Sequence, residues 1–282
     1  MGTNPGNTAR ELEHQLRLCK VKFMIASVSS IDVAKKACVA VNLLSNRLFA
    51  FNPRFDDIPS NYQSWWRLFE HGQAEWETIV HSTEEACSYI SSSGTSGLPK
   101  AVVIPHKYLE NQVNGLIMRK LPYKVARPYP ATNACANTFK VSRLICIPPF
   151  AGYNVPSNHG APIKVGEPCY VLPRYEISAV LAAVKKFQIT ECLLIPPILL
   201  DMPQNQHVLA DPAALMPLRQ IFCGGAAIGK GVQSRLYALL HPEARIAQVY
   251  GLTEAGWTCA SLYPEKDETG SVGKPLLTYE VK

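Results

Sequence analysis

The strongest constraint on the fold is a β-α-β pattern toward the C-terminal end of the chain. An apolar strand that ends in two glycines, an amphipathic helix and a second apolar strand follow one another as LRQIFCGG, AIGKGVQSRLYALL and ARIAQVYG. A helical crossover of this kind makes its two strands parallel. The pattern therefore predicts an α/β fold in which mostly parallel sheets are covered by helices.

A predicted helix and strand precede this unit and show the same alternation of an amphipathic helix with an apolar strand. Apolar residues recur at three- and four-residue spacings between residues 175 and 187, which predicts a helix with one buried face. These residues are Ile177, Val180, Leu181, Val184 and Phe187. The short apolar strand TECLLIP comes next. From Ser88 onward the chain alternates between such strands and helices, which is typical of a sheet buried on both faces.

Composition and charge narrow the class of protein. The 282 residues are 47% hydrophobic and 18% charged, so the chain can bury a sizeable core and is unlike a disordered protein. Lys and Arg exceed Asp and Glu by 28 to 22, but they are scattered and form no basic run. We therefore expect no nucleic-acid partner.

Cysteine spacing and hydropathy bear on the cellular location. No two of the nine cysteines have the C-x-x-C spacing of a zinc or dithiol site, and several lie in apolar runs, as expected of free thiols in a reducing compartment. The longest apolar run, Cys192 to Leu200, is short and contains Pro196 and Pro197, so no membrane span is expected. The N-terminus lacks the order of a signal peptide, and the prediction is a cytoplasmic protein.

One loop has the properties that a polyphosphate requires. Hydroxyl side chains and glycines alternate from residue 92 and end in a lysine: Ser92, Ser93, Gly94, Thr95, Ser96, Gly97, Leu98, Pro99 and Lys100. The glycines allow the backbone amides to approach a phosphate, the hydroxyls donate hydrogen bonds, and Lys100 supplies a mobile positive charge. The alternative is an ordinary surface turn between a strand and the helix that begins near Lys107.

Two well-known phosphate-binding motifs do not fit this loop. A Walker loop needs G-x-x-x-x-G-K-[ST], but Pro99 precedes Lys100 here and Ala101 follows it. The loop also lacks the G-x-G-x-x-G pattern of dinucleotide-binding folds. In open α/β sheets, ligands bind beyond the carboxyl ends of the strands, so Gly224-Gly225 and Tyr250-Gly251 are placed to meet one ligand.

Four segments, taken in order, resemble the adenylate-forming (AMP-binding) superfamily, which includes acyl-CoA synthetases, 4-coumarate-CoA ligase-like enzymes and adenylation domains of nonribosomal peptide synthetases. The segments are YISSSGTSGLPKAVVIPH, the turn CGGAAI, QVYGLTE and GSVGKP. The resemblance implies that the chain is part of the large N-terminal domain of that fold. One difference is Ala101, where the family usually has Gly after the lysine.

The resemblance implies a role for each site residue. Gly224, Gly225 and Ala226 would line the adenine side of an ATP or AMP site, and Tyr250 would stack near the base, beside Gly251. Thr253 would reach the α-phosphate. Glu254 would hold Mg²⁺, since a hard cation prefers a carboxylate. Lys100, Thr253 and Glu254 are accordingly the expected catalytic residues, and singly each of these segments also fits an ordinary turn or strand end.

The implied reaction is the attack of a substrate carboxylate on the α-phosphorus of ATP, which gives an acyl-adenylate and pyrophosphate. The expected partners are a small carboxylic acid and a thiol acceptor, either CoA or carrier-protein phosphopantetheine. The family's aromatic-His element corresponds to Pro148–Tyr153, with Ala151 where the histidine would stand. Phe150, Tyr153 and Ile195 are candidate lining residues of an acyl pocket.

The match also leads us to expect an incomplete enzyme. Residues 88–282 read as the AMP-binding core and residues 1–87 as a poorly matched part of the same domain, whereas the family's Y-x-T-G-D element, its C-terminal lid domain and its adenylation lysine have no counterpart. The expectation is a truncated acid–thiol ligase with weak or no activity. The alternative is a catalytically silent remnant that binds nucleotide at most, or an interaction module.

Overall fold

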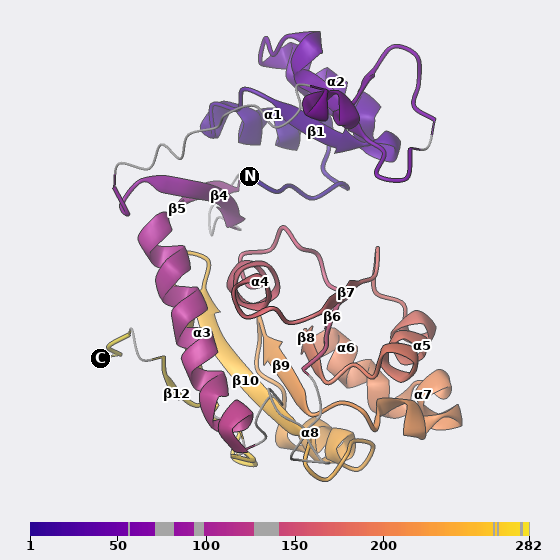
Figure 1. The fold of residues 1–282 in the computed structure, drawn as a ribbon, viewed down its shortest axis with the longest axis vertical. Coiled ribbons are helices and arrows are strands. Elements are labelled where there is room, and N and C mark those ends of the chain that lie inside the picture. Colours follow the sequence, from indigo (N-terminus) through magenta and orange to yellow (C-terminus); the bar gives the residue numbers. More distant parts are fainter. Residues whose placement is uncertain are drawn as a thin grey trace. The chain divides into compact units, whose positions relative to one another are not determined.

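The computed structural model describes residues 1–55, 57–70, 82–92, 99–126, 141–261, 263, 265–276 and 279–281. The chain divides into two compact units, Met1–Pro105 and His106–Lys282. Each unit has a hydrophobic core of its own. In Figure 1 the colours of the first unit run from indigo to purple, and those of the second run from magenta to yellow.

The first unit contains a small parallel sheet and two helices. Strands β1 (Met24–Ser27), β2 (Leu48–Phe51) and β3 (Gln63–Ser64) pair in that order, with short 3₁₀ turns at Val28–Ser30, Ser45–Arg47 and Trp65–Phe69. Helix α1 (Ala9–Leu18) begins at a capping box, in which Thr8 and Glu11 each accept the other's backbone N–H. Helix α2 spans Ile31–Ala40. The apolar faces of α1 and α2 form one core with the sheet.

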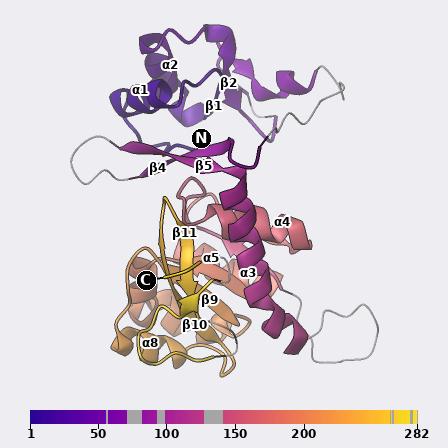
Figure 2. The same cartoon turned by 90° about the vertical axis from the view of Figure 1, so that its left-hand side faces the viewer.

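An antiparallel hairpin completes the first unit and flanks the predicted phosphate loop. Strand β4 (Ala86–Ser92) pairs with β5 (Lys100–Pro105), and Ser92 is the register partner of Lys100. The hairpin is the purple pair of arrows in Figure 2. Its two strands place the first and last residues of the loop opposite each other.

The second unit is built on a seven-stranded sheet with the order β12-β11-β10-β9-β8-β6-β7. Five neighbouring strands are parallel, and β11 and β12 run antiparallel at one edge. The strand bounds are Arg143–Ile145 (β6), Cys169–Val171 (β7), Glu191–Leu194 (β8), Gln220–Gly224 (β9), Arg245–Leu252 (β10), Gly256–Ala260 (β11) and Lys274–Pro275 (β12). The predicted parallel α/β architecture is thus confirmed, including the β-α-β unit of β9 and β10.

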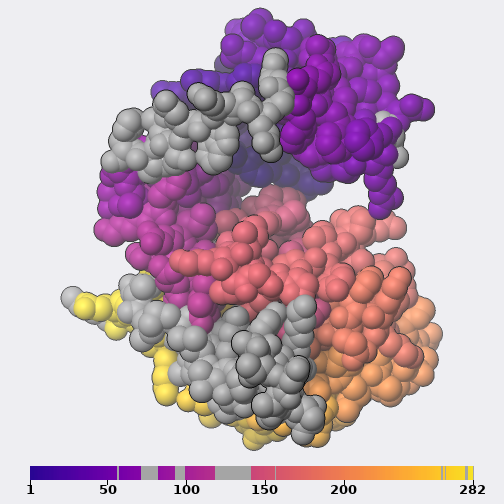
Figure 3. All heavy atoms as spheres, in the orientation of Figure 1, coloured from indigo at the N-terminus to yellow at the C-terminus, as the bar shows by residue number. Residues whose placement is uncertain are grey.

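Helices cover both faces of this sheet. On one face lie α3 (His106–Ala126), the π-helix Val155–Gly160 and α4 (Ala161–Val165). On the other lie α5 (Ile177–Phe187), α6 (Pro196–Asp201), α7 (Gln206–Ala210), α8 (Lys230–Tyr237) and the 3₁₀ turns Met202–Gln204 and Pro212–Leu215. In Figure 3 the orange atoms at the lower right belong to this part of the second unit.

Helix α5 shows how the apolar spacing produces the core. Ile177, Val180, Leu181 and Val184 are buried, as predicted, against strand residues such as Leu194 and Ile221. The fifth predicted position, Phe187, is 37% exposed because it lies at the helix end, where its ring stacks on Tyr170 at a centroid distance of 4.2 Å.

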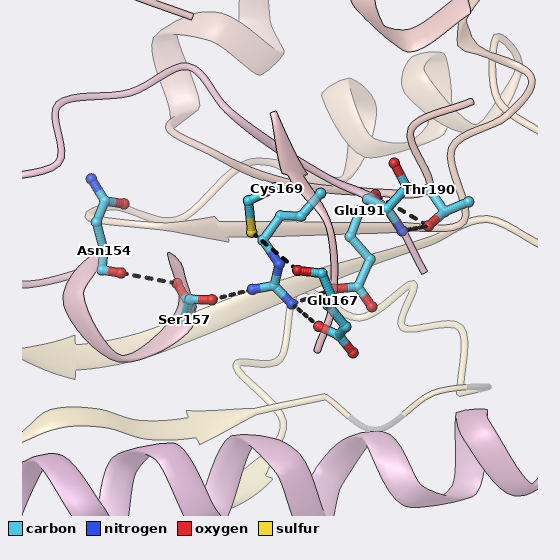
Figure 4. Close-up of polar contacts among 8 residues, drawn as sticks. Asn154, Ser157, Glu167, Cys169, Thr190 and Glu191 are labelled. Carbon is cyan, nitrogen blue, oxygen red and sulfur yellow. Dashed lines mark hydrogen bonds and ion pairs between the residues drawn. The ribbon is translucent and has the colours of Figure 1, made fainter. Parts of the chain in front are cut away.

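A buried charge cluster ties together the amino-terminal ends of the parallel strands. The Arg143 guanidinium, at the start of β6, pairs with Glu191 at 2.8 Å and with Glu167 at 3.0 Å. It also donates a hydrogen bond to the carbonyl of Ser157 in the π-helix (Figure 4). All three charged side chains are at most 3% exposed. Since breaking a buried pair leaves an uncompensated charge, the cluster fixes this end of the sheet, opposite to the predicted ligand edge.

Candidate functional site

The carboxyl ends of β9 and β10 bring two predicted site segments together. The strands are parallel neighbours in which Val249 is the register partner of Gly224. At this edge the chain leaves the sheet after Gly224, whereas β10 continues beyond Val249 to Leu252 and pairs there with β11. Gly225 has a φ of +92°, a conformation that a glycine adopts without strain, and both Gly225 and Ala226 are exposed.

Tyr250 presents its ring at this edge. Its side chain is 51% exposed, and its carbonyl accepts a hydrogen bond from Oγ1 of Thr258 at 3.0 Å. The register with β11 shifts directly after Tyr250, at Gly251. A Cβ atom on Gly251 would lie 2.9 Å from the carbonyl carbon of Gly256, so only glycine fits this bulge. The bulge leaves an aromatic face open to a ligand.

Thr253 and Glu254 lie in the turn between β10 and β11. Glu254 is exposed, and Thr253 is half-buried. The segment is the β-turn of a hairpin. Tyr108, on α3, donates a hydrogen bond from its hydroxyl to the carbonyl of Thr253 at 3.3 Å. The turn therefore projects a hydroxyl and a carboxylate from the same edge that carries Tyr250.

An aromatic wall lies directly beneath the glycine turn. The Tyr153 ring packs on Gly224, where a Cβ atom would come within 2.5 Å of the ring carbon Cζ. Tyr153 also stacks on Trp257, with centroids 5.5 Å apart, and its carbonyl accepts a hydrogen bond from the indole N–H at 2.9 Å. Burial raises the pKa of Tyr153 well above its ordinary value, so the hydroxyl stays protonated. Phe150 and Ile195, the other predicted lining residues, are half-buried.

The predicted phosphate loop is described only at its two ends. Ser92 and Lys100 face each other across the hairpin in the first unit, and Lys100 is exposed. Ser93, Gly94, Thr95, Ser96 and Gly97 lie outside the described residues, and their role stays a prediction. The other described site residues belong to the second unit.

Helix α1 holds both ends of this loop, a role that the sequence did not reveal. The Nε2 of Gln15 donates to Oγ of Ser91 at 3.0 Å, and the His14 ring nitrogen is hydrogen-bonded to the carbonyl of Pro99 at the same distance. Gln15 is only 6% exposed. Residues 1–87 are the part of the chain that the sequence motifs match poorly, and no signal in their sequence pairs Gln15 with residues far along the chain.

A magnesium ion that is bound to a nucleotide needs few ligands from the protein. Among the described residues, no group of three or more His, Cys, Asp and Glu side chains gathers to hold a metal. Mg²⁺ bound to a nucleotide needs one or two carboxylates, because phosphate oxygens and waters supply the rest. Glu254, whose exposed carboxylate makes no ion pair with a described residue, fits that mode.

The chain is an α/β protein in which a glycine turn, an exposed aromatic ring and a Thr-Glu turn follow the carboxyl ends of parallel strands, where ligands of open α/β sheets usually bind. The family model for AMP-binding enzymes matches residues 1–282, and the chain therefore belongs to the AMP-binding enzyme family. None of the described helices combines the length and the apolar character that a membrane crossing requires.

Two of the curated relatives are acyl-CoA ligases by name. The acyl-CoA ligase azaF and the phenylacetyl-CoA ligase epaB, both of Aspergillus niger, are each 34% identical over 288 aligned residues. The alignments cover 100% of this chain and 51% of each relative, so the chain spans about half the length of these proteins.

A solved structure shares the fold. The anthranilate CoA ligase AuaEII in complex with anthranoyl-AMP superposes with a TM-score of 0.78 at 19% identity, over 99% of this chain and 50% of that one. The predicted fold, that of the N-terminal domain of adenylate-forming enzymes, is confirmed.

Proposed function

We propose that these residues form the adenylate-binding part of an acid–thiol ligase, which activates a carboxylic acid with ATP. The observation that carries the proposal is the shared edge of β9 and β10: the exposed Gly225 and Ala226 follow Gly224, and Tyr250, with its half-exposed ring, follows Val249, the register partner of Gly224. The family match and the acyl-CoA ligase relatives support it. The roles of the individual residues are part of the proposal.

Each described residue has a task that suits its chemistry. The backbone of Gly224 to Ala226 lines the adenine, and the Tyr250 ring stacks near it, since a base offers a face to an aromatic side chain. The hydroxyl of Thr253 donates a hydrogen bond to an α-phosphate oxygen. Lys100 and the loop from Ser92 bind the β- and γ-phosphates through a positive charge, hydroxyls and amides.

The bond changes follow from these contacts. An oxygen of the substrate carboxylate attacks the α-phosphorus, the bond to the β-phosphate bridging oxygen breaks, and pyrophosphate leaves. The carboxylate is already nucleophilic, so the protein contributes alignment and stabilisation of the charge on the phosphate oxygens. Glu254 would hold a magnesium ion, which would supply further positive charge to these oxygens.

The substrate acid and the thiol acceptor are inferred from the candidate pocket residues and from the relatives. The half-buried Phe150 and Ile195 and the ring of Tyr153 favour an apolar or aromatic acid, and the relatives favour CoA as the acceptor. Ala151 replaces the histidine of related enzymes, so a contact made by that imidazole is missing. We expect adenylate formation by these residues alone to be slow.

Calorimetric titration with Mg·ATP tests the binding site. The wild-type chain is expected to bind, and Glu254→Gln is expected to weaken binding about tenfold, because the cation loses its carboxylate. Glu268→Gln is the matched control, since Glu268 is an exposed carboxylate paired with Lys266 at 2.8 Å in another loop. Failure of the wild type to bind Mg·ATP would favour the silent-remnant or interaction-module alternative.

Carboxylate-dependent exchange between ATP and pyrophosphate tests the chemistry. Phenylacetate, benzoate, hexanoate and phenylalanine cover aromatic, fatty and amino acids. Slow exchange with the aromatic or apolar acids is the expected result. Exchange that is confined to the amino acid would contradict the proposed acid class.

A further inference from the structure

Helix α3 contacts the turn that carries Thr253 and Glu254. In both ribbon views the magenta helix runs beside the β10–β11 hairpin (Figures 1 and 2). Two of its residues, Tyr108 and Gln112, stand one helical turn apart and therefore lie on the same face. We call this pair the α3 clamp.

Gln112 binds the hairpin backbone as a neighbouring strand would. Its side chain is completely buried, its Oε1 accepts the Trp257 N–H at 2.7 Å, and its Nε2 donates to the Trp257 carbonyl at 3.0 Å. The Nε2 also lies 3.4 Å from the carbonyl of Ala255. Both backbone groups of Trp257, the second residue of β11, are thus satisfied by one side chain from α3.

A second phenol extends this network. Nε2 of Gln112 donates to the Tyr279 hydroxyl at 2.6 Å, and that hydroxyl donates in turn to the carbonyl of Ala255. Ala255 directly follows Glu254, so the backbone on the carboxyl side of the turn is held at Ala255 and again at Trp257, two residues further on. A buried network in which each polar group has a partner is rigid.

Tyr108 holds the other side of the turn through its hydrogen bond to the Thr253 carbonyl. Burial raises the pKa of Tyr108, and the nearby Tyr279 and Glu254 raise it further. The phenol therefore stays protonated and remains a donor at neutral pH. Its position near Glu254 links the clamp to the carboxylate that is proposed to hold Mg²⁺.

No space separates the clamp from the turn. Gly256 has a φ of +71°, and a Cβ atom there would lie 2.5 Å from Cδ of Gln112 and 2.6 Å from the Tyr108 hydroxyl. The helix approaches the hairpin so closely that only a glycine fits between them.

We propose that Tyr108 and Gln112 are positioning residues that fix the Thr253–Glu254 turn for the α-phosphate and magnesium of a bound nucleotide. The inference rests on the proposed function. It adds that the side chains on α3 set the orientation of the turn, so that the ligand does not have to order it. A turn that is ordered in advance binds more tightly, because less conformational entropy is lost on binding.

Two variants and two matched controls test the clamp in the full chain. Tyr108→Phe removes one hydroxyl, and Gln112→Leu removes the amide with little change in volume. Tyr170→Phe, in β7, and Gln233→Leu, a buried glutamine of α8 that donates to the Asp267 carbonyl at 2.6 Å, change the same groups elsewhere. The dissociation constant of ATP is measured with Mg²⁺ and with EDTA.

A positioning role predicts a magnesium-dependent effect. Tyr108→Phe is expected to raise the dissociation constant about threefold and Gln112→Leu about tenfold with Mg²⁺, with smaller changes in EDTA and none in the controls. The effects of Tyr108→Phe and Glu254→Gln are expected to be non-additive, since both act on the same cation contact. A purely structural role for the clamp would weaken binding equally in both conditions.

Hydrogen exchange of the amides from 253 to 257 measures the turn directly, with about tenfold faster exchange expected in Gln112→Leu. Should that variant fail to fold, Tyr108→Phe, which loses a single oxygen atom, decides the question. Binding by the wild type with unchanged magnesium dependence in the variants overturns the positioning role alone. Absence of binding by the wild type overturns the proposed function and the positioning role together.

Discussion

Gln15 of helix α1 donates a hydrogen bond to Ser91 of strand β4 at 3.0 Å, across 76 positions of sequence. The same side chain accepts a hydrogen bond from the hydroxyl of Thr3 at 2.7 Å. A buried amide thus joins the N-terminal segment to the strand that leads into the predicted phosphate loop.

Replacement of Gln15 by leucine is expected to lower the free energy of unfolding by about 1–3 kcal/mol, because the hydroxyls of Ser91 and Thr3 lose a buried partner. Urea unfolding followed by circular dichroism measures the change. Gln206→Leu, at an exposed position of α7, is the control and should stay within about 0.5 kcal/mol of the wild type. Equal stabilities of the two variants would show that the Gln15 contact contributes nothing.

A methyl group at Gly224 is expected to displace the Tyr153 ring and destabilise the second unit by about 1–3 kcal/mol, as overpacking does. Trp257 fluorescence should shift, since its indole stacks on Tyr153. Gly231→Ala, where nothing lies within 4 Å, is the control. Tyr153→Leu in the Gly224→Ala background should cost less than the sum of the single changes. If the free-energy costs of the two changes were strictly additive, the contact between Gly224 and Tyr153 would be contradicted.

The pH dependence of stability tests the loop at Asp267. Burial raises the pKa of this carboxyl, but hydrogen bonds from Thr269 and Gly270 outweigh it, and the folded-state pKa lies below the ordinary value. Its stabilisation is therefore complete above the unfolded pKa of about 3.9 and lost as the pH falls through the folded value. Asp267→Asn should be less stable than the wild type at pH 7, and the gap should begin to close near pH 4 and vanish below the folded-state pKa. A stability difference between Asp267→Asn and the wild type that persists in acid would refute this role of Asp267. The same pH-dependent difference in Glu268→Gln would also refute it.

Thiol reactivity should follow burial. Burial raises the pKa of Cys146 and of Cys223 to about 12, whereas Cys169 is exposed. Since the thiolate is the nucleophile, iodoacetamide at pH 8 should modify Cys169 first and reach the two buried thiols only after unfolding. Mass spectrometry of peptides from native and urea-treated protein measures the order. Rapid modification of Cys146 in the native protein would contradict its burial.

The sheet and one edge of the site could be predicted because they depend on local patterns. The spacing of Ile177, Val180 and Val184 marks a buried helix face, and two strands joined by a helix must be parallel. Once β9 and β10 are parallel neighbours, Gly224 and Tyr250 lie near the same edge of the sheet, at the carboxyl ends of the two strands. Short sequence motifs were therefore enough to predict the position of the segments that lie at strand ends.

The contacts that hold these segments could not be predicted. Gln15 and Gln112 are single polar residues on helices, and Gln112 binds a backbone 145 positions away. A side-chain amide that binds main chain leaves no pattern in the partner's sequence, because every residue carries the same backbone groups. Likewise, the β-turn at Glu254 follows from the bulge at Gly251, which depends on the pairing with β11.

The buried cluster of Arg143 has a consequence for how the sheet pairs. Arg143 and Glu191 are register partners in neighbouring strands, at the first position of each. A slip of one residue between β6 and β8 would turn these side chains to opposite faces and leave a charge in the interior without its partner. Apolar residues on both strands would tolerate such a slip far better. The ion pair thus specifies the register of β6 and β8. The native register has a lower free energy than a register shifted by one residue, because only the native one pairs the buried charges.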